Sequence, residues 1–93
     1  MQIGICTIQL GIPDTFSLKD KRNICSSLFI RVRKNFNVSI AETLKQDSYR
    51  ESVITIVTVN TNKSHLYRTL SKVVEFIEQD KRVNIQNYTT EVL

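Results

Sequence analysis

The chain has 93 residues, of which 41% are hydrophobic and 24% are charged, and its 13 Lys and Arg against nine Asp and Glu give a net charge of +4. A chain of this length is predicted to form one domain, residues 1–93, with a core but no large enclosed cleft. The two glycines and one proline exclude collagen-like and linker-like chains.

No apolar segment approaches the ~20 residues of a membrane-spanning helix, and the first residues lack the basic start of a signal peptide. We therefore expect a cytoplasmic protein without a membrane partner, in which thiols stay reduced. Cys6 and Cys25 are predicted to be buried free thiols. With His65 as the only histidine, the chain offers fewer ligands than a closed zinc site needs, so no metal site and no cofactor are predicted.

Residues 2–10 alternate in the manner of a strand, and Gly11–Asp14 form a turn. Ser17, followed by Asp20 three residues later, is typical of a capping box that starts a helix running to about Asn35. Apolar residues recur along this helix at helical spacing: Leu18, Ile24, Cys25, Leu28, Phe29, Val32 and Phe36.

The rest of the chain divides into a strand over residues 38–43, a loop over 44–51, a strand over 52–60, a helix ending at 80–82 and a strand over 83–93. The third strand is rich in β-branched residues. Thr61 or Asn62 is positioned to cap the second helix. That helix is expected to bury Leu66, Leu70, Val73, Val74 and Ile77.

The order β-α-β-β-α-β predicts an α+β fold of the ferredoxin-like, split βαβ type. Such a fold has a four-stranded antiparallel sheet with both helices on one face. Its spatial strand order is 4-1-3-2, so the first and third strands are central.

The open face of this sheet is predicted to be apolar at its centre. Both central strands carry apolar residues on both sides, whereas a sheet face in water normally shows polar residues. We expect an interaction surface there, for a homodimer or another partner, with the candidates Ile3, Ile5, Ile54 and Ile56. In the alternative, Thr7, Gln9, Thr55 and Thr58 dilute the patch and the protein is a monomer.

The basic excess is concentrated in the first helix. Residues 17–34 hold six Lys and Arg against one Asp, a net charge of +5, and the remaining residues carry −1. A helix N-terminus beside basic residues is suited to bind an anion such as an RNA phosphate. The candidate residues are Ser17, Lys19, Lys21 and Arg22, followed by Arg31, Arg33 and Lys34. Lys21 falls near the apolar stripe and is expected to extend to solvent at the helix start. In the alternative, these residues form only a solvated polar face.

The sequence predicts no catalytic residues. The chain has two glycines and therefore no Gly-rich phosphate loop, and the serines of the first helix have no evident base nearby. His65 is expected on the polar side of the second helix, as a surface or capping residue. An enzyme would have to depend on His65 or Cys6. No function is predicted for the loop over residues 44–51.

Several motifs resemble the YlxP-like family of small bacterial proteins, a domain of unknown function. They are Ile12-Pro13, the string Ser17-Leu18-Lys19-Asp20-Lys21-Arg22, residues 36–42, Gln46-Asp47 and Phe76-Ile77-Glu78. The likeness covers essentially the whole chain, and residues 84–90 depart from it. The resemblance implies a ferredoxin-like fold and no established reaction. Members are often encoded beside translation genes, which suggests by analogy a role with RNA or the ribosome.

Two functions follow as hypotheses. The first is a small non-enzymatic protein of translation or ribosome maturation that contacts RNA phosphates through the basic helix. Because the first and third strands contain no aromatic residue, such contacts are expected to follow backbone shape rather than base identity. The second is a homo-oligomeric regulatory module that pairs its open sheet faces and binds a small anionic ligand at the same helix start.

Overall fold

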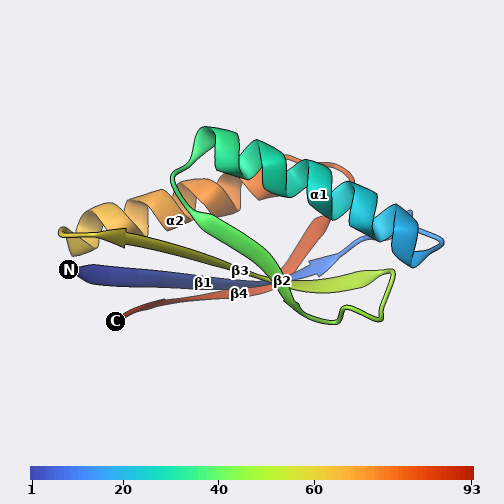
Figure 1. Ribbon diagram of the computed structural model, residues 1–93, viewed down its shortest axis with the longest axis horizontal. Helices are drawn as coiled ribbons and strands as arrows, with labels where there is room; N and C mark the ends of the chain where they lie inside the picture. The colour runs from blue at the N-terminus through green and yellow to red at the C-terminus, as the bar shows by residue number, and fades with distance from the viewer.

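The computed structural model describes all 93 residues and has the predicted order of elements. These are β1 (Gln2–Gly11), α1 (Leu18–Asn35), β2 (Ser39–Leu44), β3 (Glu51–Asn60), α2 (Lys63–Glu78) and β4 (Asn84–Val92). The strands pair antiparallel in the order β2-β3-β1-β4, which is the predicted 4-1-3-2 arrangement. Both helices cover one side of the sheet (Figure 1), so the ferredoxin-like α+β fold is confirmed. Neither helix is long and apolar enough to cross a membrane.

The two helices bury stripes of different character against the sheet. The buried residues of α2 are the five that the sequence predicts: Leu66, Leu70, Val73, Val74 and Ile77. The buried stripe of α1 is narrower and consists of Lys21, Cys25, Leu28 and Val32. At Gly4, a Cβ atom would lie 3.0 Å from Leu70 Cδ1, so glycine lets α2 pack directly on the backbone of β1. The lysine in the α1 stripe is the unexpected feature of this core.

The strand register decides which residues of the central strands face the helices. Cys6 pairs with Ile56, and Ile8 pairs with Ile54. Directly opposite residues share a face of the sheet, and all four are fully buried beneath the helices. The prediction that Ile54 and Ile56 lie on the open face is therefore wrong. Both alternating sets of β3 are apolar, so the alternation alone does not indicate which set meets the helices.

The residues of β3 that lie on the open face are those of the other alternating set, which includes Val57 and Val59. Val57 pairs with Ile5, and Val59 pairs with Ile3. The two isoleucines lie on the open face as predicted, with two valines in place of the two isoleucines of β3. The open face thus keeps an apolar centre.

Candidate functional site

The start of α1 is closed by its own side chains. Ser17 is the cap, as predicted, and its Oγ accepts a hydrogen bond from the Asp20 backbone N–H at 3.1 Å. The Asp20 carboxylate in turn accepts a hydrogen bond from the Phe16 backbone N–H at 3.2 Å. A carboxylate in the first turn stabilises the positive end of the helix dipole and opposes a second anion there. The candidate anion-binding groups are therefore the cationic side chains of α1 rather than the backbone N–H groups at its start.

Lys21 is buried, with 1% of its surface exposed, and does not extend to solvent. Its Nζ pairs with a Glu42 carboxylate oxygen at 2.9 Å and donates to the carbonyl oxygens of Lys45 at 2.8 Å and Glu51 at 3.2 Å. These three acceptors match the three N–H donors of an ammonium group. The prediction that Lys21 binds an external anion is therefore wrong. The lysine instead attaches α1 to the turn between β2 and β3.

Two further side chains complete this polar cluster between α1 and the sheet. Ser52 donates its hydroxyl hydrogen to Glu42 at 2.5 Å. The pKa of the Cys25 thiol is raised, mainly by burial and then by the Glu42 carboxylate. The charges of Lys21 and Arg82 and a hydrogen bond with Ser52 lower this pKa, but only in part. Because the thiolate is the reactive form, a thiol with a raised pKa is a poor nucleophile at neutral pH. The cluster therefore serves as a rigid polar floor beneath α1.

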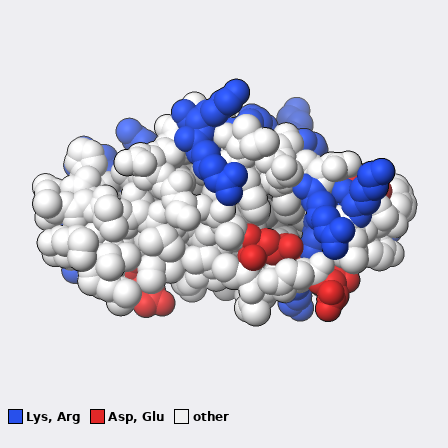
Figure 2. Space-filling model, viewed as in Figure 1, with Lys and Arg blue, Asp and Glu red and all other residues white.

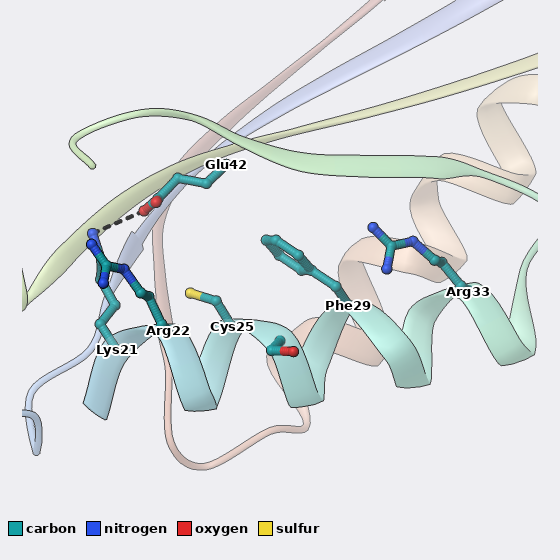
Figure 3. Close-up of a pocket in the computed structure, with 7 residues that line it drawn as sticks. Lys21, Arg22, Cys25, Phe29, Arg33 and Glu42 are labelled. Carbon is teal, nitrogen blue, oxygen red and sulfur yellow. Dashed lines mark ion pairs between the residues drawn. The ribbon is translucent and has the colours of Figure 1, made fainter. Parts of the chain in front are cut away.

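An open groove of about 380 Å³ lies between α1 and β2, over this floor (Figure 3). Its lining residues are Lys21, Arg22, Cys25, Ser26, Phe29, Arg33 and Glu42. Figure 3 shows the Phe29 side chain between Arg22 and Arg33 along the helix. The two arginines are eleven positions apart in the sequence, which separates their Cα atoms by about 16 Å at 1.5 Å per helical residue. The groove thus combines two cationic ends, an aromatic wall and one carboxylate.

Four cations of α1 are exposed and form no ion pair: Lys19, Arg22, Arg33 and Lys34. Arg33 donates one hydrogen bond to the Ile40 carbonyl oxygen at 3.0 Å, which leaves most of its five N–H donors free. Figure 2 shows Lys and Arg side chains gathered over the helix layer, while most acidic side chains in this view lie below them. These four residues form what we call the cationic face of α1.

Arg31 stands apart from the cationic face. Its guanidinium pairs with Asp80 at 3.2 Å and lies 5.4 Å from the centre of the Phe76 ring of α2. Asp80 also pairs with Arg82 at 2.7 Å. The hydrogen bond from Arg82 lowers the pKa of Asp80, and burial only partly opposes it. Arg31 therefore links the two helices at a buried carboxylate, and the structure does not bring it together with Arg22 and Arg33.

A family model described as a protein of unknown function (DUF503) matches residues 3–90. The chain belongs to this family. It is 33% identical over 76 residues to the uncharacterized protein YlxP of Bacillus subtilis (strain 168), and the match covers 82% of this chain and 83% of that protein. The YlxP-like resemblance is thereby confirmed. Neither description assigns an activity, so the function of this DUF503 protein has to be argued from its surfaces.

A cluster that no sequence pattern indicated lies beside the start of α1. The Arg50 guanidinium lies 5.6 Å from the ring centres of both Phe16 and Tyr49, and its Nε donates to the Thr15 carbonyl oxygen at 3.2 Å. The buried Thr15 hydroxyl contacts the Tyr49 carbonyl oxygen and so joins the two loops. The 34-residue separation of Thr15 and Tyr49 explains why no local pattern indicated the cluster. It places exposed aromatic rings next to the cationic face.

The residues considered for catalysis lie away from the groove. His65 is exposed in the first turn of α2, where its backbone N–H donates to the capping Asn62 side chain at 3.1 Å. Cys6 is buried under α2, and burial raises the pKa of its thiol. No group of three or more His, Cys, Asp and Glu side chains is arranged to hold a metal ion. The groove and the cationic face are therefore the features from which a function is argued.

Proposed function

We propose that this protein is a non-enzymatic, cytoplasmic RNA-binding protein whose α1 contacts RNA phosphates in translation or ribosome maturation. The observation that carries the proposal is the cationic face of α1, Lys19, Arg22, Arg33 and Lys34, in which no cation has a carboxylate partner. Four unpaired cations on one element equal the net charge of the whole chain. Lys and Arg that neutralise phosphates release counterions, and this supplies most sequence-independent affinity for nucleic acid.

The fixed position of α1 supports this proposal. The buried Lys21–Glu42 pair attaches the helix to the sheet below the cationic face. The Cα atoms of Arg22 and Arg33, about 16 Å apart, are then held at a fixed separation before any ligand arrives. Preorganised cations lose less conformational entropy on binding than side chains on a mobile segment.

The geometry favours an RNA backbone over a single base as the ligand. At about 3.4 Å of rise per nucleotide in one strand, two arginines this far apart meet phosphates that are several nucleotides apart. Neither β1 nor β3 contains an aromatic residue, so the central strands offer no platform for stacked bases. Recognition by phosphate contacts of this kind depends on the shape of the RNA rather than on its sequence.

The test is the affinity for a ribosomal RNA fragment, measured by filter binding, of the wild type and of the variant Arg22→Ala with Arg33→Ala. A hydrogen bond to a charged group contributes about 1.5–3 kcal/mol, so loss of two contacts should weaken binding at least tenfold. The matched control is Arg68→Ala with Lys72→Ala, which removes the same charge from exposed positions of α2. We expect less than a threefold change in the control. Equal losses in both variants, or no RNA binding by the wild type, would overturn the proposal.

The groove favours a second candidate, a homo-oligomeric regulatory module that binds a small anion. Its volume of about 380 Å³ lies within the range of about 300–1,000 Å³ for small-molecule sites. A small anion would contact Arg22 or Arg33 but not both. Inorganic phosphate, titrated while amide NMR shifts of α1 are followed, distinguishes the two functions. Saturable shifts near one arginine, without RNA binding, would favour this module over the RNA-binding protein.

A further inference from the structure

The open face of the sheet carries few charged side chains. The register places on it nine side chains of the two central strands: Ile3, Ile5, Thr7, Gln9, Glu51, Val53, Thr55, Val57 and Val59. Only Glu51, opposite Gly11 at one end of the face, is charged, and five are aliphatic. The residues paired with these positions and with Gly11 on the edge strands are Ser39, Ala41, Leu44, Asn84, Asn87, Thr89 and Glu91. Two carboxylates, those of Glu51 and Glu91, are therefore the only charges among these sixteen side chains.

This composition is unusual for a sheet face in water, where polar residues normally occupy the outward positions. Val59 is 60% exposed, and Ile3, Ile5 and Val57 are only half-buried by their neighbours. Among the polar residues, the hydroxyls of Thr43 and Thr55 bond to each other across the strands at 2.8 Å. The aliphatic centre of the face thus remains partly in contact with water.

We propose that a second copy of this chain covers the open face, so that two sheets pack face to face in a homodimer. The sheet is large enough for such a contact. Four strands about 4.8 Å apart and central strands of ten residues at about 3.4 Å each give a footprint of roughly 600 Å². A stable interface buries about 800 Å² of accessible surface per partner, and the accessible area of corrugated side chains exceeds their footprint.

The charge distribution favours a second copy of this chain as the occupant. Two chains of +4 repel each other, but the cationic face of α1 lies in the helix layer, on the opposite side of the sheet from the proposed contact (Figure 1). In a face-to-face dimer the two helix layers become the outer surfaces. Their separation then exceeds the Debye length of about 8 Å at physiological salt. The dimer therefore buries faces with few charges and keeps its basic helices apart.

The test is sedimentation equilibrium of the wild type and of Val57→Glu, from micromolar to submillimolar concentration. The wild type should approach twice its 10.8 kDa mass. Val57→Glu should remain a monomer, because each copy would bury an unpaired carboxylate, and its dissociation constant should rise at least a hundredfold. Ile30→Glu is the matched control, since Ile30 is 49% exposed on α1, and it should dimerise like the wild type.

A wild type that stays at 10.8 kDa throughout would overturn the proposal. So would a dimer that Val57→Glu leaves intact, since the contact would then lie elsewhere. If circular dichroism shows that Val57→Glu does not fold, Thr7→Lys decides in its place, because Thr7 is already polar and lies at the centre of the face. The proposal does not depend on RNA binding, since the two surfaces lie on opposite sides of the sheet.

Discussion

Replacement of Lys21 by Met tests the buried ion pair that positions α1. The variant keeps most of the side-chain volume but removes the ammonium group, so the Glu42 carboxylate and the carbonyl oxygens of Lys45 and Glu51 lose their donor. Removal of one partner from a buried ion pair costs about 3–5 kcal/mol. The Glu42 side chain is 20% exposed and keeps its hydrogen bond from Ser52. We therefore expect the low end of that range, about 3 kcal/mol.

Urea unfolding followed by circular dichroism measures this loss. Natural domains have free energies of unfolding of about 5–15 kcal/mol, so the variant should lose a large share of its stability. Its melting temperature should fall by about 12 °C or more. The double variant, Lys21→Met with Glu42→Met, removes both charges and should recover most of the loss, because apolar replacement of a buried pair is often neutral. The control Lys34→Met, at an exposed position of the same helix, should change the free energy by less than about 0.5 kcal/mol.

Two results would refute this reasoning. The first is a cost below about 1 kcal/mol for Lys21→Met, which is typical of an exposed pair. The second is a double variant that is no more stable than the single one, since Glu42 would then not be the group left unpaired.

Three further predictions concern stability and reactivity. Ser17→Ala removes the cap of α1 and should cost about 1 kcal/mol in urea unfolding; no loss would mean that the Ser17 hydroxyl does not cap the helix. The Arg82 hydrogen bond lowers the pKa of Asp80 in the fold, so this carboxylate stabilises the protein at neutral pH and the stabilisation is lost as the pH falls below about 4. Asp80→Asn should accordingly be less stable at neutral pH and lose less stability on acidification than the wild type, and parallel pH profiles would contradict this. Burial raises the pKa of Cys6 and Cys25, so iodoacetamide should label both only on unfolding; rapid labelling of the native protein, detected by mass spectrometry, would show that the thiols are accessible.

The fold was predictable because local signals agreed with one another. The Ser17–Asp20 capping box, the α2 stripe and the β-branched run of β3 each indicated one element, and the order of elements limits the topology. What the sequence could not indicate were the pairings between distant segments. Which of the two apolar faces of β3 packs against the helices depends on tertiary contacts. The alternation of residues does not contain this information, so Ile54 and Ile56 were predicted on the open face instead of beneath the helices.

The candidate site was predictable only in part. The excess of charge on the first helix is a local property, and Lys19, Arg22, Arg33 and Lys34 are exposed there as expected. Lys21 and Arg31 form ion pairs with carboxylates that are 21 and 49 positions away in the sequence, and these pairs remove them from the cationic face. A helical wheel gives no information on such partners. The position of Lys21 within the apolar stripe was the one sequence signal that pointed to its burial.

The salt dependence of RNA binding tests the central claim most directly. Single-stranded RNA gives a slope of about −0.7 per neutralised phosphate in a plot of log K against log salt concentration. The four residues of the cationic face therefore predict a slope of about −2.8 for the wild type, and about −1.4 for the variant that lacks the Arg22 and Arg33 guanidinium groups. A slope near zero, or one that the loss of both arginines leaves unchanged, would contradict phosphate binding by α1.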